Sequence, residues 1–359
     1  MRFIVIDIAA SSGGAMTILK GFYNYIKANS EHEWIFLLSD NYIEETDNIK
    51  VWVYAKQKQS RFRRLLFDFF TGRNVIRKSG ADAIVNFQNT RICGSKVPQI
   101  IYQDQPIPFQ KAKSFSFFKK DERDMAVYQY LIGAMVKAAT KKSQSVVVQT
   151  EWMRNAVIKQ CRVPEENVYL IPPAIDLPEI FYRESETAQY DQRNFFYPAS
   201  DAVYKNHECI YKACKLLEEE NISIKMSVTI KGSQSSNIEF LGAIPYEEVI
   251  RKYKTSTLVF PSYIETYGLP LAEARRLNCI VLAADTEFSR ELLNDYNNAY
   301  FFNYEKPDEL AALMKKVALG NIKREHNAIV FNEDGLFDGW EKFHEICVIT
   351  AQNQFAAKK

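Results

Sequence analysis

The sequence has few residues that bind transition metals, and no pattern gathers them. Its 359 residues include only four histidines, and its six cysteines are scattered without a Cys-x-x-Cys pair. Structural zinc sites need four such ligands at short, regular spacings. We therefore expect no zinc cluster, and we interpret the cysteines as reduced thiols of a cytoplasmic protein.

Long apolar runs and a strong charge of one sign are also missing. No run of 18 apolar residues occurs, so no transmembrane helix is expected. The N-terminal MRFIVIDIAA has neither the charged leader nor the cleavage site of a signal peptide. The net charge of +2 gives no indication of a nucleic-acid partner. No Gly-x-Gly-x-x-Gly fingerprint lies near Gly13, which argues against an ordinary dinucleotide-binding oxidoreductase.

Short apolar runs of strand length do recur, and helical patterns separate them. This alternation predicts an α/β fold with parallel sheets, helices on both faces, and ligands at the carboxyl ends of the strands. The polar run 183–193 predicts a domain boundary between residues 182 and 183. The strands are predicted at 3–8, 34–38, 49–54, 83–86, 99–102, 145–149, 168–171, 194–197, 224–231, 238–241, 257–260, 280–283 and 299–302.

The helical patterns are just as regular. Thr150 is a plausible N-cap for the helix that follows it, and the chain end from Gln352 is expected to fray. The main helices are predicted at 60–79, 121–139, from 207 through 217, from 246, at 307–319 and at 337–349.

The stretch 257–274, TLVFPSYIETYGLPLAEA, organises the rest of the chain. A buried strand runs into a loop, and Pro270 fits the first turn of the helix that follows. The amides of residues 267–269 should then lie at a positive helix terminus, which favours a phosphate. Glu265 and Glu273 flank the turn. They suit a binding site, although glutamates in such loops can also be simple caps or solvated charges.

This stretch resembles the Glu-x7-Glu signature of retaining glycosyltransferases of family four, usually Pro-Ser-x-x-Glu-Gly-Phe-Gly-Leu-Pro-x-x-Glu-Ala. Thr266 and Tyr267 replace the common Gly and Phe. The resemblance implies the GT-B fold, with two facing Rossmann-like domains. The first would span 1–182 plus a returning helix over 339–359, and the second 183–338. It also implies that Glu265 faces the donor sugar, that Glu273 holds the ribose, and that the donor lies against Thr266, Tyr267 and the amides of Gly268 and Leu269.

The resemblance continues at other strand ends on the donor side. Lys205-Asn206 matches a family Lys-Asn that neutralises the donor diphosphate; a surface lysine is the alternative. The Arg that often precedes it is absent, which leaves Ser200 or a backbone amide as its substitute. The family places the turns that contain Gly13-Gly14 and Gly242 beside the diphosphate and the base, respectively. For Gly13 and Gly14 a purely structural turn is an equal alternative.

The acceptor side departs from the family. Members usually carry a His at the end of the strand within IIYQDQPIPFQ, and this chain has Asp104 there, between Gln103 and Gln105. An acid at this place could orient an acceptor hydroxyl or act as a base. It could equally form an Asx turn before Pro106.

Two stretches combine basic residues with aromatic ones, as segments that lie on anionic membranes do. In KAKSFSFFKK, residues 111–120, we expect Phe115 and Phe117 to contact the surface or the acceptor. In the helix at 60–79 we favour Leu65 and Phe69 facing the core, with membrane contact as the alternative.

The resemblance implies a glycosyltransferase that moves a hexose-type sugar from a nucleotide diphosphate, with a UDP-sugar preferred, to a carbohydrate or lipid-linked acceptor. The family implies retention and a role in bacterial surface-polysaccharide synthesis. No Asp-x-Asp occurs, so we expect neither metal nor cofactor, with Lys205, Glu265 and Asp104 as catalytic residues. The location would be cytoplasmic, with peripheral contact to an anionic membrane. The alternative is a non-catalytic subunit that binds a sugar or a protein partner. The absence of the family His and Arg supports this alternative.

Overall fold

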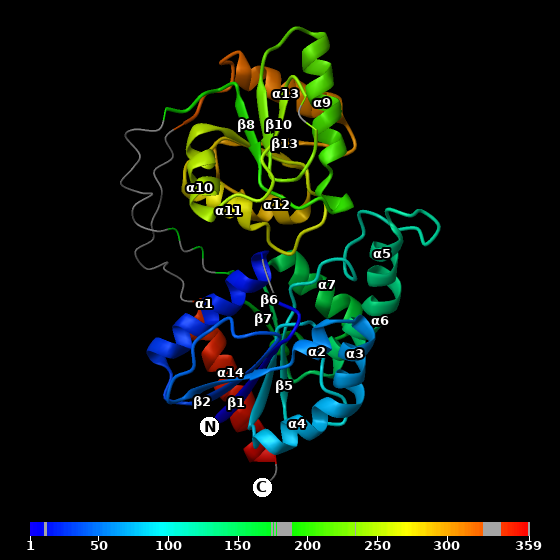
Figure 1. Ribbon diagram of the computed structural model, residues 1–359, viewed down its shortest axis with the longest axis vertical. Coiled ribbons are helices and arrows are strands. Elements are labelled where there is room, and N and C mark those ends of the chain that lie inside the picture. The colour runs from blue at the N-terminus through cyan, green and yellow to red at the C-terminus, as the bar shows by residue number, and fades with distance from the viewer. Residues whose placement is uncertain are drawn as a thin grey trace. The chain divides into compact units, whose positions relative to one another are not determined.

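The computed structural model describes residues 1–10, 13–173, 175, 177, 189–233, 235–325 and 339–357. The chain forms two compact units: unit 1 comprises Met1–Ala174 with Glu333–Lys359, and unit 2 comprises Ile175–Asn332 (Figure 1). The predicted boundary between residues 182 and 183 lies outside the described residues. No helix in the described part of the chain is long and apolar enough to cross a membrane.

Unit 1 contains a seven-stranded sheet in the order β3-β2-β1-β4-β5-β6-β7, and every pair of neighbours is parallel. Its central strands are aliphatic and fully buried, as expected of a sheet covered on both faces. The strands are β1 Arg2–Asp7, β2 Glu33–Leu38, β3 Ile49–Val53, β4 Ala83–Asn86, β5 Gln99–Tyr102, β6 Ser145–Val148 and β7 Val168–Leu170. Each lies within two residues of its predicted position.

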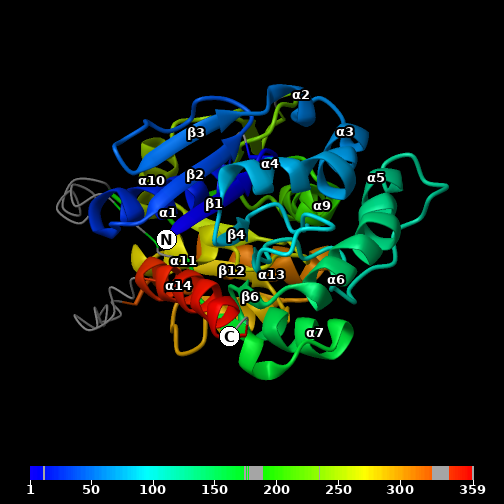
Figure 2. The same cartoon turned by 90° about the horizontal axis from the view of Figure 1, so that it is seen from below.

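Alternate residues of β1 point into two different cores, which places helices on both faces of this sheet. Phe3 and Val5 pack with α1 (Gly13–Asn29) and α14 (Gly339–Ala357), while Ile4 and Ile6 pack toward the opposite face (Figure 2). The other helical segments are α2 Ala55–Lys58, α3 Arg61–Leu66, the π-helix η1 Phe67–Thr71, α4 Gly72–Ser79, α5 Arg123–Ala126, the π-helix η2 Val127–Ile132, α6 Gly133–Lys142, α7 Glu151–Cys161 and the 3-10 turn η3 Glu165–Asn167.

The C-terminal helix α14 belongs to unit 1, where it packs beside α1. The ring of Phe343 lies 4.9 Å from that of Phe22, and Ser145 and Thr350 share a hydrogen bond of 2.7 Å. Side chains of α14 at helical spacing, from Phe343 to Ala351, are buried against the sheet. The helix continues to Ala357, so the prediction of a frayed end from Gln352 is wrong: helical backbone extends beyond the buried Ala351.

Three further local expectations need correction. The helix predicted over 60–79 contains the π-turn η1, and Phe67 is the ring that packs inward while Phe69 is 42% exposed. The expectation that Phe69 faces the core is therefore wrong. Thr150 lies at the N-cap position of α7, but its side chain makes no capping hydrogen bond. The helix predicted over 121–139 is divided by η2.

Unit 2 contains a six-stranded parallel sheet in the order β10-β9-β8-β11-β12-β13. Its strands are β8 Asn194–Tyr197, β9 Lys225–Val228, β10 Ile238–Phe240, β11 Thr257–Phe260, β12 Val281–Ala284 and β13 Ala299–Phe302. Its helical segments are the 3-10 turn η5 Val203–Lys205, α9 His207–Glu219, α10 Tyr246–Thr255, α11 Leu269–Arg276, α12 Glu287–Leu292 and α13 Pro307–Ala318.

The two sheets share one topological feature. In each, the first strand lies inside the sheet, and the chain builds outward first on one side and then on the other. The side on which the chain adds new strands therefore switches between β1 and β4 in unit 1 and between β8 and β11 in unit 2. Loops diverge at such a switch and leave a crevice at the carboxyl ends of the strands, where ligands of α/β proteins bind. The prediction of an α/β fold with two parallel sheets is confirmed.

Candidate functional site

Lys205 and Glu265 meet at the switch point of unit 2. Lys205 ends the turn η5 that follows β8, and Glu265 lies in the loop that follows β11. Lys205 Nζ lies 2.5 Å from Glu265 Oε1, and the two side chains are only 18% and 15% exposed. The structure thus brings together two residues that are 60 positions apart in the sequence and that the sequence predicted as catalytic.

A set of short hydrogen bonds fixes the two loops against each other. Ser262 Oγ donates to Glu265 Oε1 at 2.7 Å, and the Tyr263 amide donates to the Tyr204 carbonyl at 3.2 Å. On the other side, Tyr197 at the end of β8 donates its hydroxyl hydrogen to the Lys205 carbonyl at 3.0 Å. The ammonium and the carboxylate are therefore held in place by the fold itself.

The electrostatics keep Lys205 charged. Burial on its own would lower the pKa of Lys205, but the negative charge of Glu265 opposes this and the pKa is raised overall. The neighbouring His207 behaves oppositely, because burial and the charge of Lys205 lower its pKa to about 4. At neutral pH this site therefore presents an ammonium group that is paired with the Glu265 carboxylate and lies near a neutral imidazole.

Glu273 lies on α11, where two tyrosines bind its carboxylate. Tyr246 donates to Oε1 and Tyr253 donates to Oε2, both at 3.0 Å. Glu273 is buried, and burial raises its pKa while the two hydroxyl groups counteract part of that rise. Sequence reasoning missed both tyrosines, although their spacing of seven residues puts them on one face of α10.

The turn before α11 has the predicted form. Gly268 is the N-cap with φ of 91°, a left-handed conformation that favours glycine, and Leu269 begins the helix with proline in its first turn. Thr266 and Tyr267 are half-buried. The first amides of α11 thus lie at a helix N-terminus, at the carboxyl end of β11, as predicted.

The other residues that the sequence predicted for the donor side are distributed around this edge of the sheet. Asn206 adopts φ of 57° before α9, and its side-chain amide donates to the Tyr304 carbonyl at 2.9 Å, so it shapes the turn. Ser200 is exposed after β8. Gly242 has φ of 65° and open space where a side chain would begin. Thr229, which sequence reasoning missed, accepts a hydrogen bond from the Ala199 amide and supports the loop after β8.

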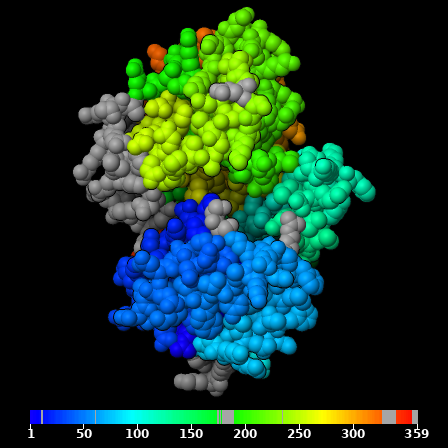
Figure 3. All heavy atoms as spheres, viewed as in Figure 1, coloured from blue at the N-terminus to red at the C-terminus, as the bar shows by residue number. Residues whose placement is uncertain are grey.

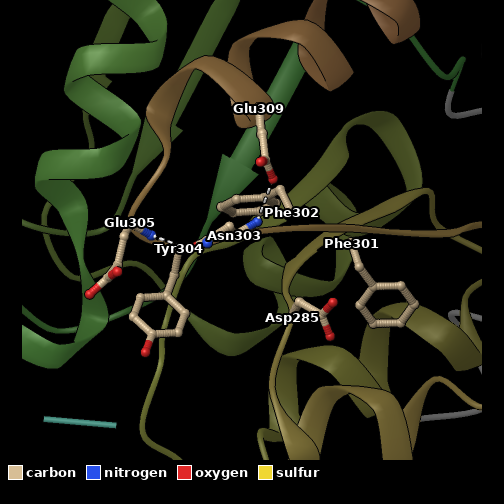
Figure 4. A pocket seen from close by; sticks show the side chains of 7 residues that line it. All are labelled: Asp285, Phe301, Phe302, Asn303, Tyr304, Glu305 and Glu309. Carbon is tan, nitrogen blue, oxygen red and sulfur yellow. Dashed lines mark hydrogen bonds between the residues drawn. The ribbon is translucent and has the colours of Figure 1, made fainter.

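A separate cavity of about 320 Å³ lies at the carboxyl ends of β12 and β13 (Figure 4). Two of its three acids have partners: Asp285 binds Arg290, and Glu309 accepts from the Asn303 amide at 2.9 Å. An acidic lining repels a diphosphate. The turn that contains Lys205 is better suited to bind one. The lining residues are Asp285, Phe301, Phe302, Asn303, Tyr304, Glu305 and Glu309.

In unit 1, Asn89 organises the residues that the sequence predicted for the acceptor side. It adopts φ of 59°, its Oδ1 accepts from the amides of Asp104 and Gln105, and its Nδ2 donates to Asp104 Oδ1 at 2.6 Å. Burial raises the pKa of Asp104 to about 6. Asp7, at the end of β1, is also buried, and burial together with the charge of Asp104 raises its pKa to about 8. Sequence reasoning missed Asn89 and Asp7.

The structure corrects two predicted acceptor-side contacts. Gln103 is fully buried: its Nε2 donates to Asn89 at 2.7 Å and its Oε1 accepts from Thr140 at 3.0 Å, so it supports the loop from within. Phe115 is 3% exposed, and the expected surface contact is wrong because the ring packs into unit 1. Phe117 is 40% exposed and does lie at the surface.

The predicted glycine turn before α1 is not part of these hydrogen-bond networks. Gly13 begins α1 with φ of 63°, followed by Gly14, and a side chain at Gly13 would meet no atom within 4 Å; Ser11 and Ser12 of this turn lie outside the described residues. No group of three or more metal-ligating side chains occurs within the part of the chain that the structure describes.

Comparison with known proteins agrees with this geometry. Residues 179–329 match the family model described as glycosyl transferases group 1, a range that contains Lys205, Glu265 and Glu273. No curated protein sequence matches the chain. The chain thus has an α/β fold with two parallel sheets, and its second unit is similar to the glycosyl transferases group 1 family.

Solved structures share the fold at low sequence identity. WaaG, a glycosyltransferase involved in lipopolysaccharide biosynthesis, is 16% identical with a TM-score of 0.68, and the alignment covers 97% of this chain and 99% of WaaG. UDP-N-acetylglucosamine 2-epimerase from Rickettsia bellii is 14% identical with a TM-score of 0.62, covering 98% and 97%. TarM is 13% identical with a TM-score of 0.55, covering 77% of this chain and 57% of TarM. The fold is therefore GT-B, and because an epimerase shares it, the fold alone does not define the reaction.

Proposed function

We propose that this protein is a retaining glycosyltransferase that transfers a hexose-type sugar from a UDP-sugar to a carbohydrate or lipid-linked acceptor in surface-polysaccharide synthesis. The family model over unit 2 supports sugar transfer. The observation that carries the proposal is the ion pair between Lys205 and Glu265 at the switch point. The UDP moiety and the polysaccharide role are suggested by the names of the fold relatives.

The pair suits the two charges that develop during transfer. As the bond between the anomeric carbon and the diphosphate breaks, negative charge gathers on the leaving group and positive charge on the sugar ring. Lys205 and the first amides of α11 would stabilise the diphosphate, and Glu265 would face the sugar. Because these charged groups belong to the chain itself, we propose that no metal or cofactor is needed, and activity that survives EDTA would support this.

In this proposal, unit 1 binds the acceptor. Asp104 is held by Asn89, and its raised pKa of about 6 is suited to accepting or positioning the proton of a hydroxyl group. Retention rests on the family resemblance, and the anomeric configuration of the product, read by NMR, tests it. We further propose a cytoplasmic enzyme with peripheral contact to an anionic membrane, a contact that is argued in the next section.

A nucleotide-binding experiment tests the donor site. UDP should raise the melting temperature of the wild type, because a ligand held by the native state stabilises it. Lys205→Ala should abolish most of that shift and reduce turnover of labelled UDP-sugars at least about tenfold, a barrier increase of roughly 1.4 kcal/mol. Lys215→Ala, an exposed lysine on α9 of the same unit, is the matched control and should leave both unchanged.

Glu265→Gln separates the proposal from its alternative. An enzyme should still bind UDP in this variant but lose turnover. A non-catalytic sugar-binding subunit would bind UDP or a sugar in the wild type without any turnover. Screening UDP-, GDP- and TDP-sugars in the same assay identifies the base, and a response to none of them contradicts the proposed donor.

A further inference from the structure

We propose that one face of the helical segment α3–η1 in unit 1 is a docking surface for a lipid bilayer that contains anionic lipids. The segment presents large apolar side chains to solvent at positions that share one side of a helix. They are Phe62, Leu66, Phe69 and Phe70, which are 68%, 38%, 42% and 61% exposed.

This exposure is not needed to build unit 1. Phe67 and Ile76 of the same helical run already fill the core beneath it. Phenylalanine is among the residues most often buried, and clusters of exposed apolar side chains usually mark an interaction site. The four exposed side chains therefore form an apolar face without a function inside the described part of the chain.

The charge around this face is strongly positive. Residues 55–79 contain eight Lys or Arg and one acid, Asp68, a net charge of +7, whereas the whole chain carries only +2. Asp68 is buried, and burial raises its pKa to about 7, so it is only partly ionised at neutral pH. Arg73, Arg77 and Lys78 are exposed, and none of them forms a salt bridge to another described residue.

A second apolar group lies on the same side of unit 1. The segment around α5 stands out from the body of this unit (Figure 3), and α3 and α5 lie toward the same side in both Figure 1 and Figure 2. Phe118 is 96% and Leu131 is 62% exposed there. Lys113 and Lys119 of this segment both pair with Glu122, at 2.9 and 3.5 Å, so most of the positive charge comes from residues 55–79.

The combination favours a bilayer over a second copy of the chain. In a two-fold dimer the same face would meet itself and bring two groups of arginines together, which is unfavourable. An anionic membrane instead supplies apolar depth for the phenyl rings and negative headgroups for the arginines. The lipid bilayer therefore complements both the apolar and the charged part of this face.

Sedimentation with vesicles tests the proposal on the full chain. The wild type should bind vesicles of phosphatidylcholine mixed with phosphatidylglycerol, bind phosphatidylcholine alone much more weakly, and be released by salt. The double variant Phe62→Ser, Phe70→Ser should lose at least about tenfold in affinity, since two phenyl rings no longer leave water. Leu319→Ser, another exposed apolar residue but in unit 2, is the control and should bind like the wild type.

A charge variant tests the second half of the argument. Arg73→Glu with Arg77→Glu should remove the preference for phosphatidylglycerol, whereas Lys212→Glu with Lys215→Glu on α9 should retain it. Lys205→Ala should bind vesicles normally, so the result is independent of sugar transfer. Three results would each overturn the proposal. The wild type does not bind vesicles, the phenylalanine variant binds them as well as the wild type, or the wild type forms an oligomer that the phenylalanine variant does not form. Because all substituted side chains of these surface variants are exposed, an unchanged melting temperature confirms that they are folded.

Discussion

Both carboxylate oxygens of Glu273 accept hydrogen bonds from tyrosine hydroxyls. A buried carboxylate that loses a hydrogen-bond donor retains the cost of leaving water without its compensation. The tyrosines thus hold in place the carboxylate that the family resemblance assigns to the ribose.

Tyr253→Phe removes only the hydroxyl group that donates to Glu273 Oε2. We expect the free energy of unfolding to fall by about 1–3 kcal/mol at neutral pH, as for other donors removed from buried acids. Denaturant titration followed by circular dichroism measures this change. Tyr300→Phe, a half-buried tyrosine in the same unit for which the structure gives no hydrogen bond, should change it little. An equal loss in both variants would show that the hydroxyl bond to Glu273 is not the cause.

Asp7 makes the stability of the chain depend on pH. Its pKa is raised from 3.8 to about 8 in the folded state, mainly by burial and then by the charge of Asp104. The folded state therefore holds this proton more tightly than the unfolded chain. The stabilisation is complete below the ordinary carboxyl pKa and is lost as the pH rises toward the folded value.

Asp7→Asn keeps the shape of the side chain and removes its titration. Relative to this variant, the wild type should lose unfolding free energy between about pH 4 and pH 8, at a slope of up to about 1.4 kcal/mol per pH unit. Urea titrations across that range measure the slope. Asp47→Asn, an exposed acid of unit 1, should run parallel to the wild type; a parallel curve for Asp7→Asn would contradict the assignment.

Residues with local signals were predictable, and residues that act through tertiary contacts were not. Gly268 and Pro270 mark a helix start in any context, and Glu265 was found through its spacing in the signature. Asn89 is one polar residue in a loop, and only the fold places it beside Asp104. Gln103 and Phe115 were placed wrongly because the sequence does not show which side chains their loops turn inward.

At the scale of elements, α11 depends on the turn that precedes it. Gly268 has φ of 91°, and a side chain there would approach Leu271 Cδ1 to 3.3 Å. A residue other than glycine at positive φ costs about 1–2 kcal/mol in backbone strain alone. The first turn of α11, which carries the amides that we assign to the donor, would have to shift in addition.

Gly268→Ala should therefore destabilise the protein more than Gly242→Ala does. Both glycines have positive φ, but no atom lies within 4 Å of the position that a Cβ would take at Gly242, so this residue isolates the backbone penalty. Denaturant titration compares the two variants, and Gly268→Ala should also weaken UDP binding. If Gly242→Ala costs as much as Gly268→Ala, the contact with Leu271 does not constrain the start of α11.

The elements themselves were predicted well where the hydrophobic pattern is strong. The strands at 83–86, 99–102 and 299–302 occur at the expected residues, because short β-branched and aromatic runs between polar loops have few other conformations. The π-turns η1 and η2 were not predicted. An inserted turn changes which side chain points inward, and that is why Phe67 rather than Phe69 packs into the core.

At the scale of the whole molecule, all four tryptophans lie in unit 1. They are Trp34, Trp52, Trp152 and Trp340, the last on the returning helix α14. Because each unit has its own sheet and its own core, each can respond separately to a ligand. Tryptophan fluorescence thus reports on unit 1, while Lys205 and Glu265, which carry the proposed donor site, lie in unit 2.

UDP should therefore act on one unit and leave the other nearly unchanged. At a hundredfold excess over its dissociation constant, a ligand stabilises the form that binds it by about 2.7 kcal/mol. Amide hydrogen exchange in β8 and β11 should slow in the presence of UDP, whereas the unfolding transition seen by tryptophan fluorescence should not move. Gly268→Ala provides the ligand-free counterpart, since it should speed exchange in unit 2 without shifting the fluorescence transition. The opposite outcome is that UDP shifts the fluorescence transition as much as it protects β8 and β11. In that case the nucleotide either binds unit 1 or couples the two units into one cooperative fold. Either result contradicts the assignment of the donor to unit 2 alone.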